Sequence, residues 1–246
     1  MTLNELIKLA KKYEKALPEF QPPAVADQPM ERWIDHTILK PESTPEQVDQ
    51  VCTDALTWNF KAVCVNPVFV PQVASRLRGS GTAVCTVAGF PLGASITSTK
   101  VYETRKAILQ GATEVDMVIA VGLLKGGHYK QVLKDIQTVT VACHQKGVVC
   151  KVIIENALLT TFDKILACLM VKQAGADFVK TSTGFAATGA TVADVELMRR
   201  VVGPQLGVKA AGGVRSLSDA RDMLAAGATR LGTSAGVKIM QELKQG

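Results

Sequence analysis

The sequence predicts an α/β fold, a single (β/α)8 TIM barrel with an additional N-terminal helix. Eight short apolar runs recur along the chain, and longer stretches of helical periodicity separate them. The length of 246 residues suits one such barrel. The alternative is an open, doubly wound sheet, but no G-x-G-x-x-G motif follows the first strand, which disfavours its nucleotide-binding form.

The first element is an amphipathic helix over residues 3–17, where apolar residues recur at helical spacing among lysines and glutamates. Charge throughout this segment excludes a secretory signal peptide. Prolines at positions between 18 and 29 then predict a connector. We expect residues 1–30 to form the helix and connector, residues 31–246 to form the barrel, and the helix to pack on it.

The eight expected strands are short and largely apolar. They are Ile34–Thr37, Ala62–Val65, Ala83–Val87, Glu114–Ile119, Cys150–Glu155, Phe178–Thr181, Gly207–Ala210 and Arg230–Thr233. Helix-start signals follow three of these strands, each a hydroxyl side chain with an acid or amide three residues later. The signals are Thr44–Gln47, Thr191–Asp194 and Ser216–Asp219.

Composition narrows the class of partner. The formal charge of +6 suits a phosphorylated metabolite, an acidic membrane or nucleic acid. Lysines and arginines are scattered, however, and aromatic residues make up only 5% of the chain, so we expect no nucleic-acid partner. No apolar stretch approaches the roughly 18 residues that a membrane span needs. We therefore expect no membrane partner either.

Cysteine and histidine usage points to an intracellular protein without a metal. The six cysteines show no C-x-x-C spacing, and the three histidines are too dispersed for a metal-ligand motif. We expect free, buried thiols, no disulfide framework and no metal. Without a secretory signal, such a chain is best placed in a reducing cytoplasm.

Two lysines, Lys180 and Lys209, stand where an apolar strand ends. A buried charge at such a position costs free energy unless pairing or function offsets it. In a parallel barrel the carboxyl ends of all strands open onto one face, where active sites form. The separation of 29 residues fits one strand-helix-strand repeat, so we expect the two lysines on neighbouring strands.

Strand alternation predicts further polar side chains inside the barrel. It places Asp116 on the inner face of the fourth strand, Lys151 and Glu155 together on the fifth, and Asp35 with Thr37 on the first. Each residue taken singly fits a structural ion pair. Lysines and carboxylates that converge from five strands favour a reactive site.

A lysine with its ordinary pKa of about 10.4 is protonated near neutral pH, so a nucleophilic lysine needs a shift of roughly 3 units. A second ammonium about 6 Å away contributes roughly 3 kcal/mol at an effective dielectric constant of 20, and burial can supply the rest. The pair of lysines therefore predicts a Schiff-base amine with a tuning cation beside it.

Small residues after the last strands predict a phosphate site. Gly212 and Gly213 follow the seventh strand, and Gly232 opens a run of small residues that includes Ser234 after the eighth. Such residues free backbone N–H groups at helix starts, the usual phosphate position in these barrels. Gly184, after the sixth strand, adds a third side to this predicted phosphate site. Simple tight turns are the alternative explanation.

Seven segments of the chain together resemble the deoxyribose-phosphate aldolase family. They are Asp35–Pro41, Cys64–Pro67, Val87–Gly93, Glu114–Val118, Lys151–Glu155, Val179–Gly184 and Lys209–Arg215. The likeness runs in order from about Ile34 to Gly236 and leaves the N-terminal helix and connector outside it.

The resemblance implies a class I aldolase, a carbon-carbon lyase without a cofactor. Such enzymes interconvert 2-deoxy-D-ribose 5-phosphate with acetaldehyde and D-glyceraldehyde 3-phosphate in deoxyribonucleotide catabolism. Lys180 then matches the Schiff-base lysine. Lys209 matches the second lysine, which keeps the nucleophile unprotonated and helps to move protons, and Asp116 matches the acid/base aspartate.

The resemblance also implies the substrate contacts, with the phosphate on Gly184, Gly212, Gly213 and Ser234. The full set of implied substrate-binding residues is Asp35, Thr37, Cys64, Lys151, Thr183, Gly184, Gly212, Gly213, Arg215, Gly232 and Ser234. The expected partners are a phosphorylated sugar and an aldehyde, and the expected assembly is a homo-oligomer, either a dimer or a tetramer.

Two positions depart from the family pattern. Phe185 stands where family members often carry a phosphate-contacting lysine, so we expect looser phosphate discrimination. The sequence ends at Gly246 without the terminal tyrosine that assists proton transfer in some members. Proton transfer is therefore expected to use Asp116, Lys209 and water.

Two other functions stay open from the sequence. One is a different lysine-dependent phosphosugar aldolase of the same barrel, such as a transaldolase-like or fructose-bisphosphate aldolase-like enzyme. The other is a non-catalytic phosphosugar-binding barrel, in which the lysines only neutralise the phosphate.

Overall fold

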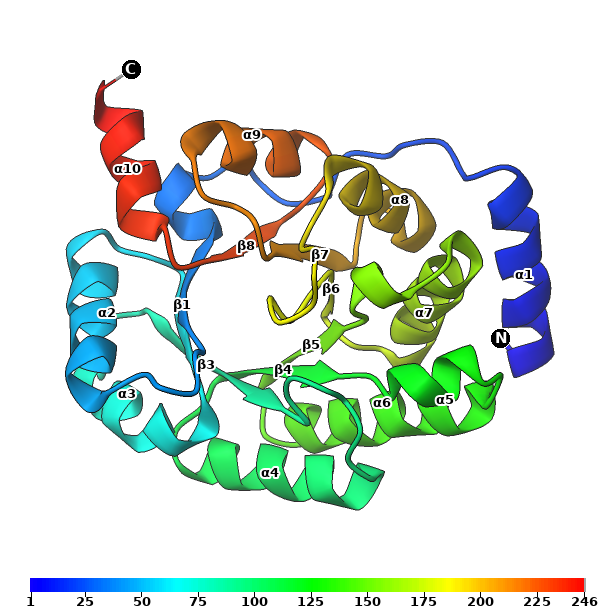
Figure 1. Ribbon diagram of the computed structural model, residues 1–246, viewed down its shortest axis with the longest axis horizontal. Helices are drawn as coiled ribbons and strands as arrows, with labels where there is room; N and C mark the ends of the chain where they lie inside the picture. Colours follow the sequence, from blue (N-terminus) through cyan, green and yellow to red (C-terminus); the bar gives the residue numbers. More distant parts are fainter. Residues whose placement is uncertain (246) are drawn as a thin grey trace.

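The computed structural model describes residues 1–245, which form a closed parallel barrel of eight strands surrounded by helices (Figure 1). The strands are β1 (Ile34–Ile38), β2 (Ala62–Val65), β3 (Ala83–Ala88), β4 (Glu114–Val118), β5 (Val149–Ile153), β6 (Phe178–Lys180), β7 (Gly207–Ala211) and β8 (Arg230–Thr233). Pairing of β1 with both β2 and β8 closes the barrel. The predicted fold class is confirmed.

Helices follow the strands and cover the outside of the barrel. The α-helices are α1 (Leu3–Lys15), α2 (Pro45–Thr57), α3 (Val70–Arg76), α4 (Thr97–Leu109), α5 (Val121–Lys125), α6 (Tyr129–His144), α7 (Thr161–Ala174), α8 (Val192–Val202), α9 (Leu217–Ala225) and α10 (Gly236–Gln245). Short 3-10 helices are η1 (Met30–Trp33), η2 (Pro67–Phe69) and η3 (Asn156–Leu158).

The predicted helix-start signals are confirmed at α2, α8 and α9. The Thr44 and Ser216 side chains cap α2 and α9 in reciprocal capping boxes, and the Thr191 hydroxyl accepts the Asp194 N–H at the start of α8. These caps end the loops that leave the strands, so they fix where the loops on the active face of the barrel can lie.

Several strand ends differ by a residue or two from prediction, and one difference changes a side-chain direction. The prediction that β5 extends to Glu155 is wrong, since the strand ends at Ile153 and Glu155 lies beyond it with a left-handed φ of 55°. The chain turns here because the Asn156 N–H bonds to the Thr181 carbonyl and the Glu155 carboxylate accepts the Thr183 N–H.

The inside of the barrel has an apolar part and a charged part. An apolar cluster lies on the β2 and β3 side; it comprises Leu39, Ala62, Cys64, Cys85 and Val87. The outward side chains of the strands, such as Val115 and Met117 of β4, pack under the helices in a separate and larger core. The remaining inner positions are therefore free to carry charge.

The N-terminal helix packs on the outside of the barrel beside α7 (Figure 1). Leu6 and Ala10 on its inner face are fully buried. The connector is tied to α8 and the loop after it, because Arg200 donates to the Pro18 carbonyl at 2.7 Å and the Ala24 N–H donates to the Pro204 carbonyl at 2.9 Å. The helix therefore contributes buried apolar surface to the barrel layer.

Two features bear on partners and redox state. All six cysteines are free thiols and buried. Within residues 1–245, none of the helices combines the length and apolar character that crossing a bilayer requires.

Candidate active site

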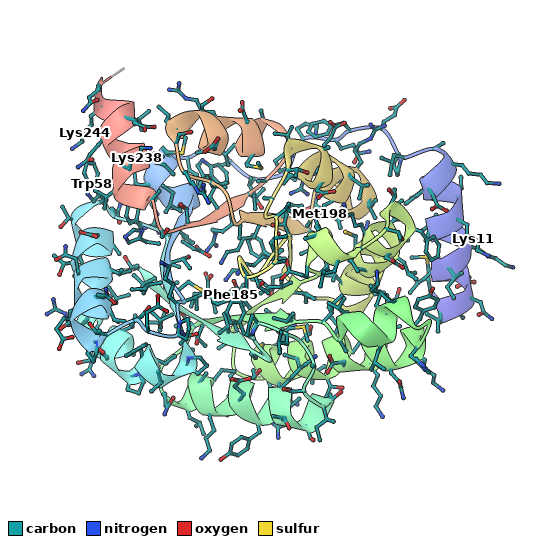
Figure 2. The ribbon with its side chains drawn as sticks, in the orientation of Figure 1. Lys11, Trp58, Phe185, Met198, Lys238 and Lys244 are labelled. Atoms are coloured by element: carbon teal, nitrogen blue, oxygen red, sulfur yellow. The ribbon has the colours of Figure 1, made fainter. Side chains whose placement is uncertain are left out.

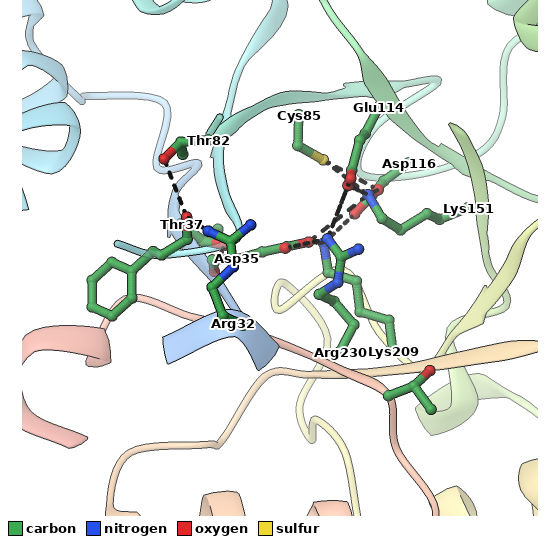
Figure 3. Close-up of polar contacts among 12 residues, drawn as sticks. Arg32, Asp35, Thr37, Thr82, Cys85, Glu114, Asp116, Lys151, Lys209 and Arg230 are labelled. Atoms are coloured by element: carbon green, nitrogen blue, oxygen red, sulfur yellow. Dashed lines mark hydrogen bonds and ion pairs between the residues drawn. The ribbon is translucent and has the colours of Figure 1, made fainter. Parts of the chain in front are cut away.

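Charged side chains meet inside the barrel around Asp116 of β4 (Figure 3). Oxygen Oδ2 of Asp116 accepts hydrogen bonds from Lys180 Nζ and Lys209 Nζ, each at 2.8 Å. Oxygen Oδ1 accepts one from Lys151 Nζ at 2.7 Å. The two lysines singled out from the sequence therefore share a single carboxylate oxygen.

Strand register explains this convergence. Lys180 of β6 is the Cα partner of Lys209 of β7, and Asp116 of β4 is the partner of Lys151 of β5. Partners on adjacent parallel strands point to the same face of the sheet. All of these side chains are buried, and Lys180 is only 2% exposed.

A second ring of contacts surrounds this centre and includes groups that the sequence did not single out. Arg230, at the start of β8, donates to Asp35 at 2.7 Å and to Glu114 at 3.1 Å. Asp35 also accepts from Lys209 at 2.5 Å, and Glu114 lies 2.6 Å from Lys151. The alternation of side chains along a strand could have predicted Glu114 and Arg230. Glu114 shares the inner face of its strand with Asp116, and Arg230 shares the inner face of its strand with Gly232.

In this network, ion pairing changes the pKa values more than burial does. Burial alone raises the pKa of Asp116, but the nearby ammonium groups of Lys151, Lys180 and Lys209 hold that pKa well below its usual value. Burial lowers the pKa of Lys209, but Asp116 and Asp35 raise it well above the usual lysine value. Asp116 is therefore ionised and Lys209 protonated throughout the neutral range.

The charge balance of the network distinguishes Lys180 from the other cations. Three carboxylates, those of Asp35, Glu114 and Asp116, are matched by Lys151, Lys209 and Arg230. A protonated Lys180 adds a positive charge that has no carboxylate of its own. With Lys180 protonated, the network holds four cations against three carboxylates.

Thr37 and Gly232 line the same interior. The Thr37 hydroxyl donates to the Asp35 carbonyl at 2.8 Å. A Cβ atom on Gly232 would lie 3.1 Å from Cε of Lys209. Gly232, which the sequence suggested as a substrate contact, therefore also makes room for the Lys209 side chain.

The rim of the barrel brings the predicted glycines together. Gly184, Gly212 and Gly213 have φ values of 90°, 79° and 90°. A Cβ on Gly212 would lie 3.6 Å from the Gly184 Cα, so the loops after β6 and β7 are in contact. Among residues 1–245, the buried Ser182 hydroxyl beside Gly212 has no hydrogen-bond partner, and sequence reasoning missed it. This rim offers polar hydrogens to an anion.

Three predicted substrate contacts lie outside the charged network. The Thr183 hydroxyl donates to Glu155 and accepts the Phe185 N–H at 3.1 Å. Arg215 is exposed, and its backbone N–H is bonded to Asp219. Ser234 is exposed in the loop before α10. Their positions on the rim suit contacts with the far end of a substrate rather than with its reacting carbon.

An aromatic pair spans the mouth of the barrel. Phe185, in the loop after β6, meets Phe90, in the loop after β3, edge to face with ring centroids 5.3 Å apart. In Figure 2, Phe185 lies inside the ring of strands. The loops after β3 and β6 therefore meet at this pair of rings.

Potential metal ligands also lie in the network, but the ammonium group of Lys151 already contacts two of them. Cys64, Cys85 and Asp116 offer atoms within 4.8 Å of one another. Lys151 Nζ lies 3.3 Å from the Cys85 sulfur and 2.7 Å from Asp116. The donor set therefore fits a lysine ammonium.

Comparison with known proteins supports an aldolase. Residues 30–242 match the family model described as the DeoC/LacD family aldolase. Deoxyribose-phosphate aldolase of Staphylococcus haemolyticus is 57% identical over 213 residues, which cover 87% of this chain and 96% of the relative. The enzyme of that name from Carboxydothermus hydrogenoformans is 55% identical over 215 residues, which cover 87% and 94%.

Solved structures give the same result and extend it to the N-terminal helix. The tetrameric deoxyribose phosphate aldolase of Aeropyrum pernix has a TM-score of 0.83 and 29% identity, with 99% of each chain covered. A structure named QR15, an aldolase, has a TM-score of 0.83 and 36% identity over 88% of this chain and 96% of its own.

Proposed function

This chain belongs to the DeoC/LacD aldolase family, and we propose that it reversibly cleaves 2-deoxy-D-ribose 5-phosphate to acetaldehyde and D-glyceraldehyde 3-phosphate through a Schiff base at Lys180. The observation that carries the mechanism is the shared oxygen of Asp116, to which Lys180 and Lys209 both donate. A phosphate-binding barrel without catalysis does not require an amine and a permanent cation on one buried carboxylate.

The reaction begins when the free amine of Lys180 attacks the aldehyde carbon of the open-chain sugar. Loss of water gives a protonated imine, which draws electrons as the C2–C3 bond breaks. Glyceraldehyde 3-phosphate leaves, the enamine is protonated at C2, and hydrolysis releases acetaldehyde and returns the amine. The protonated imine supplies the electron sink for bond cleavage.

Asp116 receives the proton of the C3 hydroxyl, directly or through a water molecule. Because three ammonium groups lower the pKa of Asp116, this carboxylate is a weak base that passes the proton on rather than storing it. Lys209 and water are the groups placed to move it onward.

Asp116→Asn is expected to reduce kcat by about 10²- to 10⁴-fold, because the amide accepts no proton and breaks the balance of the network. It is also expected to lower the free energy of unfolding by roughly 3–5 kcal/mol, since Lys151 and Lys209 lose a buried partner. Steady-state kinetics and urea unfolding measure both effects. Wild-type kcat in this variant would remove Asp116 from the proton path.

The phosphate is proposed to bind on the rim formed by Gly184, Gly212, Gly213 and Ser234. Backbone N–H groups and the free Ser182 hydroxyl support this placement. Phe185 brings no charge to this rim and is 49% exposed, so selectivity for the phosphorylated sugar is expected to be modest.

Phe185→Lys is therefore expected to lower KM for deoxyribose 5-phosphate about fivefold, the effect of roughly 1 kcal/mol from one partly exposed ion pair. KM for unphosphorylated deoxyribose should not fall. Phe185→Ala, which also breaks the contact with Phe90 but adds no charge, is the matched control. Equal changes for both sugars in both variants would show that the charge does not reach a phosphate.

The test of the function itself is a product assay. The purified protein is incubated with deoxyribose 5-phosphate, and acetaldehyde and glyceraldehyde 3-phosphate are quantified separately. We expect equimolar products. Fructose 1,6-bisphosphate and transaldolase substrates, tested in parallel, address another lysine-dependent aldolase of the same barrel, and binding of the sugar without products would support a non-catalytic barrel.

We also propose a homo-oligomer in a reducing cytoplasm. The tetramer of the Aeropyrum pernix relative, which matches the chain including its N-terminal helix, supports assembly. Exposed apolar side chains at Leu92, Ile96 and Leu109 give the outer surface near α4 an apolar character. Six free thiols fit a reducing compartment.

A further inference from the structure

Two cysteines face each other inside the barrel, next to the proposed nucleophile. Cys64 of β2 and Cys85 of β3 are Cα partners in the parallel register, and both are fully buried in the inner apolar cluster. Their sulfur atoms lie within 4.8 Å of each other and of an Asp116 oxygen. The proposed aldolase reaction gives Cys85 no role.

The backbone geometry suits a covalent link between these sulfurs. Adjacent strands lie about 4.7–4.9 Å apart, and disulfides join Cα atoms about 4.4–6.8 Å apart. Side chains of register partners point to the same face, so both sulfurs already share the barrel interior. A bond between Cys64 and Cys85 can therefore form without moving β2 away from β3.

The two thiols differ in their readiness to react. The neighbouring Cys85 side chain, followed by the positive charges of Lys209 and Lys180, lowers the pKa of Cys64 despite its burial. Burial and the neighbouring Cys64 side chain raise the pKa of Cys85 well above the usual value. An easily ionised thiol beside a protonated one is the arrangement of an attacking and a resolving cysteine.

We propose that Cys64 and Cys85 form a peroxide-sensitive thiol pair whose conversion to a disulfide reversibly inactivates the enzyme. The Cys64 thiolate attacks hydrogen peroxide, which forms an S–O bond and releases hydroxide. The Cys85 thiol then attacks the sulfenic sulfur, the S–S bond forms and water leaves. Peroxide is the two-electron oxidant, and it is smaller than the sugar that must reach Lys180.

Disulfide formation acts on the active site through Asp116. The Cys85 sulfur donates to Asp116 Oδ1 at 3.3 Å and accepts from Lys151 at 3.3 Å. Bonding to Cys64 removes the thiol hydrogen of Cys85 and draws the sulfur away from both groups. The carboxylate that serves Lys180 and Lys209 then loses one donor and its fixed orientation.

A second pair of neighbouring cysteines provides a control within the same chain. Cys143 of α6 and Cys150 of β5 are also neighbours, but they lie in the core under the helices. The neighbouring Cys150 side chain and burial raise the pKa of Cys143. This pair is therefore expected to resist the peroxide concentration that oxidises Cys64.

The test treats the intact enzyme with hydrogen peroxide under native conditions, blocks remaining thiols and maps the cysteines by mass spectrometry. We expect a mass loss of about 2 Da from the S–S bond, a peptide linking Cys64 to Cys85, and an activity loss of at least tenfold that dithiothreitol reverses. Cys143→Ser should behave in the same way.

Cys85→Ala, compared with its own untreated activity, should form no disulfide and should overoxidise at Cys64, so that dithiothreitol no longer restores activity. Inactivation of the wild-type enzyme without a Cys64–Cys85 linkage would overturn the proposal. The proposal would also be overturned if dithiothreitol restored the activity of peroxide-treated Cys85→Ala as fully as that of the wild-type enzyme. The wild-type map alone decides the matter if the variant does not fold.

Discussion

Lys180→Met is expected to reduce cleavage of deoxyribose 5-phosphate by at least about 10⁴-fold, because the proposed imine forms on the Lys180 side chain. The same variant should keep or slightly raise the free energy of unfolding. Removing Lys180 leaves Lys151, Lys209 and Arg230 to match three carboxylates, so the buried network becomes neutral. Initial rates and urea unfolding of one protein preparation measure both effects.

Lys151→Met is the matched control, since it makes the same substitution in the same network. Lys151 lies within hydrogen-bond distance of Asp116 and Glu114 and is fully buried. Its loss takes one buried cation from both Asp116 and Glu114 and leaves three carboxylates without an equal number of tightly paired cations, so the free energy of unfolding should fall by about 3–5 kcal/mol. If Lys180→Met were the more destabilised of the two, the charge assignment of the network would be wrong.

Lys209→Met is expected to move the acidic limb of the kcat/KM profile upward by about two pH units. Only the free amine attacks the aldehyde, and a cation beside it disfavours its protonation. Two hydrogen bonds of 2.8 Å meeting at one oxygen place the nitrogens no more than about 6 Å apart, which corresponds to roughly 3 kcal/mol at a dielectric constant of 20. Without this cation, the amine becomes free only at higher pH.

The sign of this shift depends on the charge that Lys209 carries. Its pKa is raised, so Lys209 stays protonated while the profile is recorded and contributes a constant field. Lys209→Arg preserves that charge and should keep the limb near its wild-type position, even if kcat falls for steric reasons. A limb that stays in place in Lys209→Met would contradict the tuning role.

The fold and the centre of the site follow from strand periodicity. A period of two placed Asp116 and Lys151 on inner faces, and the 29-residue separation placed Lys180 beside Lys209. These features are local to each strand or to one repeat, so a single sequence contains them. Hydroxyl caps likewise fixed the starts of α2 and α9 because both partners lie within one turn.

The remaining features depend on contacts between distant segments. Arg230 begins its strand, and only barrel closure brings its side chain to Asp35, 195 residues away, and to Glu114. The Glu155 turn depends on Thr183 in the next loop. The pairing of Cys64 with Cys85 needs the register of β2 against β3, which neither strand encodes alone.

The most direct test of the Schiff-base mechanism is reductive trapping. The enzyme is incubated with acetaldehyde and borohydride, digested and mapped by mass spectrometry, with Lys180→Met treated in parallel. The proposed mechanism predicts a stable ethyl adduct on Lys180 in the wild-type protein and none at position 180 in the variant. An unmodified Lys180, or an adduct formed preferentially on Lys209 or Lys151, would contradict it.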